Sequence, residues 1–114
     1  MSLELVIRHV DGVCVVDVIG HVVMGKTSQA LQDMIADLLT KDERSVLLNL
    51  DGVTYVDSSG IGELVRSLVT IADRGGKLKL FNVPKRIKDL MRLSGITEKF
   101  EVFEDEAKAV ASFS

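Results

Sequence analysis

The sequence predicts a single α/β domain that spans residues 1–114, with a mixed, mostly parallel central sheet, packed helices and an N-terminal β-hairpin. A chain of 114 residues has room for one domain, and 46% hydrophobic residues are enough to form a core. Segments with strand-like and helix-like hydrophobic spacing alternate along the chain, with short connections between them. Such alternation is typical of parallel strands joined by right-handed helical crossovers.

The first segment predicts the β-hairpin. Leu3, Leu5 and Ile7 alternate with polar neighbours, as in a strand with one buried face. A turn at residues 10–12 separates them from the valine-rich run 13–19, which predicts the second strand of the hairpin.

Two helices and a strand are predicted next. Apolar residues at spacings of three and four indicate a helix from about Thr27 to Lys41, followed by a short apolar strand at residues 46–50. A second helix begins near Ser59 and ends before the Gly75-Gly76 pair. Its buried stripe is expected to consist of Ile61, Leu64, Val65, Leu68, Val69 and Ala72.

The same alternation continues to the end of the chain. Residues 78–83 predict a strand, and Pro84 suits the first position of a helix that ends at Gly95. Residues 100–103 predict a last short strand, and residues 107–111 a closing helix. Because the carboxyl ends of parallel strands share one edge of a sheet, segments 20–27, 51–62 and 82–85 are expected to lie close together there, and a functional site is expected among them.

Two serines follow an aspartate at the start of the second predicted helix. An oxygen of Asp57, Ser58 or Ser59 could cap this helix by accepting hydrogen bonds from its free backbone N–H groups. Alternatively, Ser58 could be a phosphoacceptor displayed on the turn, with Asp51 and Asp57 beside it. A phosphate there would change what docks to this surface and would leave the helix intact, because a helix N-terminus stabilises negative charge.

Residues 49–62, NLDGVTYVDSSGIG, resemble the signature of the STAS domain, which is found in bacterial anti-sigma factor antagonists and in transporter-associated proteins. The order of predicted elements is similar as well, over nearly the whole chain. The resemblance implies a non-enzymatic binding switch in which the serine directly after the aspartate, Ser58, is phosphorylated. The implied partners are an anti-sigma factor that acts as a serine kinase, bound while Ser58 is unphosphorylated, and a PP2C-type phosphatase that resets the switch; no cofactor is implied.

The partner is expected to dock on the turn and on the loop beside it. The chain departs from the family in that loop, because acidic residues usually follow the glycine at the position of Gly20, whereas apolar residues dominate here. This difference makes the expected docking face more apolar. The expected contact residues are Asp57, Ser59, Gly60, Ile61 and Gly62 of the turn, and His21, Val22, Val23 and Met24 of the loop.

Two other functions are compatible with the sequence, and a third is disfavoured. Gly20, Gly25, Lys26 and Thr27 occupy the fixed positions of the phosphate-binding pattern GxxxxGK[ST], although adjacent β-branched residues between them disfavour a phosphate-binding loop. The same fold could also serve as the STAS regulatory subunit of an ABC transporter. A serine hydrolase is disfavoured, because Asp57 stands where the GxSxG motif around Ser59 requires glycine.

Charge and composition narrow the classes of partner. A net charge of −3 disfavours binding to nucleic acid or to an anionic membrane surface, and one Tyr with no Trp offers little for base stacking. No apolar run is long enough for membrane insertion. The single cysteine, Cys14, cannot form an intramolecular disulfide and is expected in the core, no metal site is predicted from residue spacing, and a cytoplasmic location is expected.

Overall fold

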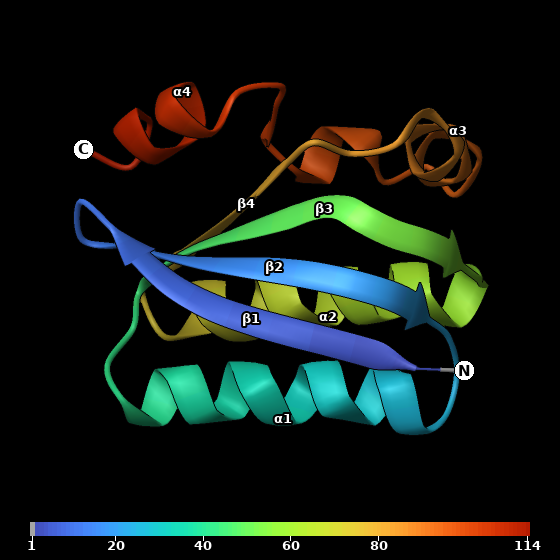
Figure 1. Ribbon diagram of the computed structural model, residues 1–114, viewed down its shortest axis with the longest axis horizontal. Coiled ribbons are helices and arrows are strands. Elements are labelled where there is room, and N and C mark those ends of the chain that lie inside the picture. The colour runs from blue at the N-terminus through green and yellow to red at the C-terminus, as the bar shows by residue number, and fades with distance from the viewer. Residues whose placement is uncertain (1) are drawn as a thin grey trace.

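One mixed sheet organises the computed structural model, which describes residues 2–114 (Figure 1). The strands are β1 (Leu3–Val10), β2 (Val13–Val22), β3 (Ser45–Val56), β4 (Lys77–Phe81) and β5 (Val102–Phe103). The helices are α1 (Lys26–Thr40), α2 (Ser58–Asp73), α3 (Lys85–Leu93) and α4 (Glu106–Ala111), with a 3-10 turn at Thr97–Lys99. The strands lie in the order β1-β2-β3-β4-β5; β1 is antiparallel to β2, and all later pairs are parallel. The predicted fold class is confirmed.

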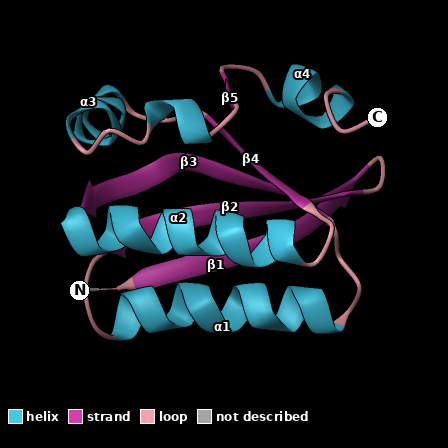
Figure 2. Cartoon of the chain, turned by 180° about the vertical axis from the view of Figure 1, so that it is seen from behind, coloured by secondary structure: helices cyan, strands magenta, loops and turns pink. Residues whose placement is uncertain are grey.

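Helices cover the two faces of the sheet unequally. Helices α1 and α2 lie side by side against one face (Figure 2). Strand alternation sends every second residue to that face, so Cys14, Val16 and Leu48 pack there with Ile87 of α3. On the opposite face, α4 forms a smaller apolar cluster with the residues Val13, Val15, Leu47, Phe81, Ala109 and Val110.

The predicted hairpin and first helix are confirmed. The hairpin places Leu3 opposite Gly20 and Val10 opposite Val13. The buried residues of α1 are Thr27, Leu31, Met34, Ile35, Leu38 and Leu39, so the predicted stripe faces the core. Within residues 2–114, no helix is both long enough and apolar enough to cross a membrane.

Strand β3 is longer than predicted. Residues 51–56 are a continuation of the strand, whereas the sequence predicted a loop after residue 50. Irregular pairing lets β2 follow it, so that Ile19 pairs with Gly52 and Val22 with Val56. A Cβ atom at Gly52 would lie 2.9 Å from Ile19 Cγ1. Glycine at this position therefore permits strand pairing and does not mark a loop.

The buried face of α2 differs from the predicted stripe. Val69 and Ala72 are exposed, whereas Glu63, Ser67 and Ile71 are buried. Glu63 can face inward because α2 packs beside α1, whose side chains supply hydrogen-bond donors, and Ser67 Oγ donates to the Glu63 carbonyl of its own helix at 2.9 Å. Glu63 Oε1 accepts hydrogen bonds from Ser28 Oγ at 3.1 Å and from Gln32 Nε2 at 2.7 Å. The two helices are thus joined by a buried polar contact, which apolar spacing does not reveal.

The two C-terminal strands are shorter than predicted. Strand β4 ends at Phe81, and β5 contains only two residues. Pro84 is the N-cap of α3 and not its first helical residue, so this detail of the prediction was wrong. The Lys79 ammonium, which lies on the α4 side of the sheet, donates a 2.9 Å hydrogen bond to the carbonyl of Ser112 and so helps to dock the C-terminal residues.

Candidate functional site

The three predicted segments meet at the carboxyl edge of the parallel strands. The last residues of β2 and β3, Val22 and Val56, are paired, and helices α1 and α2 begin just beyond them. The Arg86 guanidinium of α3 donates a 3.1 Å hydrogen bond to the Thr54 carbonyl, which brings the segment after β4 to the same edge. The predicted convergence of these segments is confirmed.

Asp57 links the elements at this edge. Its Oδ1 accepts a 2.8 Å hydrogen bond from the Gly60 N–H, which makes Asp57 the N-cap of α2. Its Oδ2 accepts a longer hydrogen bond, of 3.4 Å, from the Met24 N–H in the β2–α1 loop. Among the capping residues that the sequence left open, the structure selects Asp57. Both carboxylate oxygens therefore accept hydrogen bonds from backbone N–H groups, and the Asp57 side chain is only partly exposed.

Ser58 and Ser59 occupy the first two positions of α2, and both are exposed. With Asp57 as the cap, neither serine hydroxyl is needed to start the helix. The α2 macrodipole presents partial positive charge at these positions, and the first turn contains no acidic residue. A kinase could therefore reach the Ser58 hydroxyl, and a phosphate there would lie at the favourable end of the helix.

Four of the expected contact residues are buried. Val22, Val23 and Ile61 pack inward, and Gly60 lies so close to β2 that a Cβ atom would come 2.0 Å from the Val22 carbonyl oxygen. The expectation that these side chains contact a partner is therefore corrected. They hold α2 and the β2–α1 loop in place, because apolar strand ends and a glycine allow the close approach of helix and strand.

The exposed residues at this edge form what we call the serine surface, which consists of Met24, Tyr55, Ser58, Ser59 and Gly62. Met24 is 74% exposed and Tyr55 is 46% exposed, so both side chains are accessible from solvent. His21 is half-buried and packs near Tyr55, with 6.3 Å between the ring centroids. Tyr55 was not predicted, because residues 51–56 read as a loop. Simple strand alternation would place Tyr55 on the same side of β3 as Val53, which is buried, so the exposure of Tyr55 is seen only in the structure.

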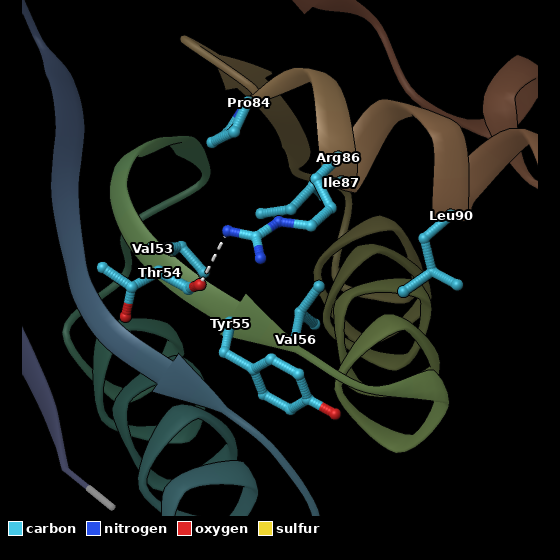
Figure 3. Close-up of a pocket in the computed structure, with 8 residues that line it drawn as sticks. All are labelled: Val53, Thr54, Tyr55, Val56, Pro84, Arg86, Ile87 and Leu90. Carbon is cyan, nitrogen blue, oxygen red and sulfur yellow. Dashed lines mark hydrogen bonds between the residues drawn. The ribbon is translucent and has the colours of Figure 1, made fainter.

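A small pocket of about 50 Å³ lies beside the serine surface (Figure 3). Residues from the end of β3 form one wall, and the first residues of α3 form the other. Its lining consists of Val53, Thr54, Tyr55, Val56, Pro84, Arg86, Ile87 and Leu90. Such a volume is too small for a nucleotide or another drug-sized ligand, which need several hundred Å³. The pocket has room for about one side chain.

The charge near Ser58 also differs from expectation. Asp57 directly precedes Ser58, but Asp51 lies within β3 and does not flank the serine. Asp51 precedes Asp57 by six positions, which corresponds to about 20 Å along an extended strand. Of the two aspartates, Asp57 is the one that lies next to Ser58.

The geometry of residues 20–27 does not support a phosphate-binding loop. Gly20, His21 and Val22 belong to β2, so that only residues 23–25 connect this strand to α1. The hydroxyl of Thr27 accepts a hydrogen bond from the Val23 N–H and donates one to the Val23 carbonyl, both at 3.0 Å. The loop is thus closed upon itself, and three residues cannot wrap around a phosphate chain.

Comparison with known proteins agrees with this architecture. The family model described as STAS domain matches residues 4–109. The anti-sigma F factor antagonist of Paenibacillus polymyxa is 22% identical over 96% of this chain and 94% of its own length. The anti-sigma-B factor antagonist of Staphylococcus aureus is 27% identical over 68% of this chain and 72% of its own.

Solved structures show the same fold. An anti-sigma factor antagonist from Mycobacterium paratuberculosis matches with a TM-score of 0.82 and 18% identity, over 98% of this chain and 94% of that one. The phosphorylated form of the Bacillus cell fate determinant SpoIIAA matches with a TM-score of 0.74 and 15% identity, over 99% of this chain and 100% of that one. A sulfate transporter family protein from Wolinella succinogenes matches with a TM-score of 0.76 and 23% identity, over 90% of this chain and 84% of that one. With the family model covering nearly all of its length, the chain belongs to the STAS domain family.

Proposed function

We propose that this protein is an anti-sigma factor antagonist, which binds an anti-sigma factor through the serine surface and is released by phosphorylation of Ser58. The observation that carries the proposal is the position of Ser58. It is exposed, it follows the capping Asp57, and it lies among exposed apolar residues at the edge where three segments meet. The names of the sequence relatives, antagonists of anti-sigma F and anti-sigma-B factors, support the class of partner.

Phosphorylation at Ser58 would act on docking rather than on folding. A phosphoserine adds about −1.5 to −2 charges at neutral pH. The α2 N-terminus offsets part of this charge, by about 0.3–1 kcal/mol, while Asp57 repels it. A partner that covers Met24 and Tyr55 would have to remove water from the phosphate, and like charges facing each other across an interface cost several kcal/mol.

Two enzymes would set the phosphorylation state of Ser58. The anti-sigma factor would be a serine kinase that uses ATP, and a PP2C-type phosphatase would remove the phosphate. The fold shared with a protein solved in a phosphorylated form is in keeping with this cycle. No catalytic role is proposed for the chain itself.

Phosphate mapping tests the switch. The protein is incubated with ATP and the anti-sigma factor kinase encoded beside it in the genome, and the modified residue is identified by mass spectrometry. We expect phosphate on Ser58 in the wild type and in Ser59→Ala, and none in Ser58→Ala. Ser59→Ala is the matched control, since it removes the neighbouring exposed hydroxyl of α2. An unmodified wild type, or phosphate that persists in Ser58→Ala, would contradict the proposal.

A second candidate is a regulatory subunit of an ABC transporter. The fold shared with a sulfate transporter family protein favours it, and the same exposed apolar residues could dock on a transporter component. Affinity purification separates the two candidates. A transporter ATPase and permease that co-purify with both wild type and Ser58→Ala would favour the transporter role over the switch.

A further inference from the structure

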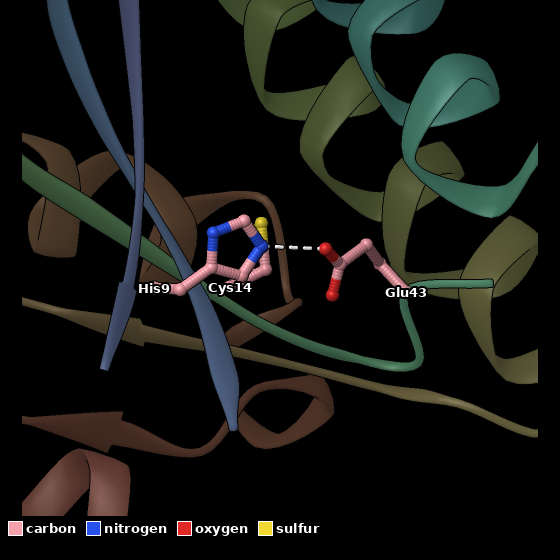
Figure 4. A group of neighbouring side chains, drawn as sticks. All are labelled: His9, Cys14 and Glu43. Atoms are coloured by element: carbon pink, nitrogen blue, oxygen red, sulfur yellow. Dashed lines mark hydrogen bonds and ion pairs between the residues drawn. The ribbon is translucent and has the colours of Figure 1, made fainter. Parts of the chain in front are cut away.

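A second group of reactive side chains lies at the opposite end of β3 from Ser58. His9 and Cys14 are paired across the β-hairpin, so their side chains share the face that α1 covers. Glu43 precedes β3, and the β3 residue Val46 pairs with Cys14. Three separate segments thus bring an imidazole, a thiol and a carboxylate together (Figure 4). Glu43 is distant in sequence, which is why residue spacing predicted no metal site.

The donor atoms are close enough to share one cation. A ring nitrogen of His9, a carboxylate oxygen of Glu43 and the Cys14 sulfur all lie within 4.8 Å of one another. The distance between His9 Nε2 and Glu43 Oε2 is 2.5 Å. Ligand atoms around a tetrahedral zinc ion lie about 3.3–3.7 Å apart. His9 and Glu43 therefore need to separate by about 1 Å while the fixed Cys14 stays in place. His9 can move, because its side chain is 57% exposed.

The chemistry of this donor set favours zinc over the hard cations. Thiolate and imidazole are ligands for zinc and similar transition metals, whereas Mg²⁺ and Ca²⁺ prefer oxygen donors alone. Charge balance is also favourable, since one thiolate and one carboxylate neutralise a divalent cation. Without a cation, burial and the nearby Glu43 carboxylate raise the pKa of the Cys14 thiol to about 11.

We propose that His9, Cys14 and Glu43 form a binding site for Zn²⁺. Neutral His9 supplies the Nε2 lone pair, Glu43 a carboxylate oxygen and Cys14 a thiolate, whose proton passes to solvent as the zinc–sulfur bond forms. Water completes the four ligands on the exposed His9 side. The ion would join the β-hairpin to the segment between α1 and β3, at the end of the sheet remote from the serine surface.

Cobalt substitution and zinc titration test the site. Reduced, untagged protein is stripped with a chelator and titrated with Co²⁺, whose charge-transfer absorption reports a thiolate ligand, and with Zn²⁺ in competition with a chromogenic chelator. We expect one ion per chain and a sulfur-to-cobalt band that Zn²⁺ removes. Loss of a group that only hydrogen-bonds to a metal ligand already weakens metal binding about 10–100-fold. His9→Gln, Glu43→Gln and Cys14→Ala, which each remove a proposed ligand, should therefore weaken zinc binding at least about tenfold.

The chain's other histidine supplies the matched control. His21→Gln should bind Zn²⁺ like the wild type, because His21 lies near the opposite end of β2 from Cys14. Zinc should also raise the melting temperature of wild type and His21→Gln, and not that of the three ligand variants. A wild type without the sulfur-to-cobalt band would overturn the proposal, and so would wild-type zinc affinity in Cys14→Ala. His9→Gln and Glu43→Gln carry the test if Cys14→Ala fails to fold.

Discussion

The Asp57 carboxylate has two structural roles. It starts α2 by accepting from the Gly60 N–H, and it holds the β2–α1 loop by accepting from the Met24 N–H. The sequence identified this residue together with its serine neighbours, because Asp, Ser and Thr all favour helix N-termini. It could not decide which of them caps the helix, since that depends on the backbone angles at the strand end. With the capping role assigned to Asp57, Ser58 is free to serve another purpose.

Replacing Asp57 by alanine should destabilise the domain. We expect Asp57→Ala to lower the free energy of unfolding by about 1 kcal/mol, because the Gly60 N–H loses its partner. Asp57→Asn retains an acceptor oxygen and should lose less. Urea unfolding followed by circular dichroism measures both. Equal stability of wild type and Asp57→Ala would show that the cap contributes nothing.

Asp17 makes the stability depend on pH. Its carboxylate accepts hydrogen bonds from Arg8 Nε at 2.8 Å and from Asn49 Nδ2 at 2.9 Å, and the Arg8 hydrogen bond is the main cause that lowers the pKa of Asp17. Because this pKa is lower in the folded than in the unfolded chain, the ionised carboxylate stabilises the fold above about pH 4. The contribution is lost as the pH falls below that value.

Removing this contact should flatten the acid limb of the stability profile. Asp17→Asn should cost about 1 kcal/mol at pH 7 and should show a smaller fall in the free energy of unfolding between about pH 5 and pH 2. Arg8→Met should flatten the same region, because Asp17 then loses the donor that lowers its pKa. Urea unfolding at a series of pH values checks this; profiles parallel to that of the wild type would contradict it.

At the scale of elements, α2 approaches the end of β2 through glycine. A Cβ atom at Gly60 would lie 2.0 Å from the Val22 carbonyl oxygen and 2.6 Å from Val56 Cγ2. At Gly62, two residues further along α2 and therefore on the other side of the helix, a Cβ atom would meet nothing within 4 Å. The sequence signature contains both glycines without indicating that they differ. Only the packing of helix against strand separates them.

The two glycines provide a matched pair of substitutions. Gly60→Ala should destabilise the domain by more than about 2 kcal/mol, because α2 must shift away from the strand ends. Gly62→Ala should stabilise it by about 0.5–1 kcal/mol, because alanine favours the helix more than glycine does. Chemical denaturation measures both variants. Similar effects of the two substitutions would contradict the packing described for α2.

The sequence predicted the order and type of the elements well, for a physical reason. Apolar spacing records which side of an element is buried, and this was sufficient for the hairpin and for α1. It failed where polar residues and glycine lie inside regular structure. Asp51 and Gly52 led to the prediction of a loop where β3 continues, and the burial of Glu63 means that the buried face of α2 differs from the predicted apolar stripe. Residues 57–59 could be singled out as a candidate site because the capping and hydroxyl chemistry is local in sequence, whereas Tyr55 and the pocket depend on tertiary pairing.

At the scale of the whole molecule, the serine surface and the core are separate. The core lies between the sheet and its helices, while Ser58 is at the exposed start of α2. A charge added at Ser58 should therefore leave the fold unchanged. The free energy of unfolding of the phosphorylated protein should stay within about 1 kcal/mol of that of the unmodified protein, as measured by urea denaturation. Unfolding on phosphorylation would mean that the switch acts through the fold itself.

The central claim is that Ser58 controls docking, and the affinity for the anti-sigma factor tests it most directly. Isothermal titration calorimetry would compare unmodified protein with protein phosphorylated at Ser58, after circular dichroism has shown that both are folded. We predict that phosphorylation weakens binding at least about tenfold, which corresponds to about 1.4 kcal/mol. Equal or tighter binding of the phosphorylated protein would contradict the claim.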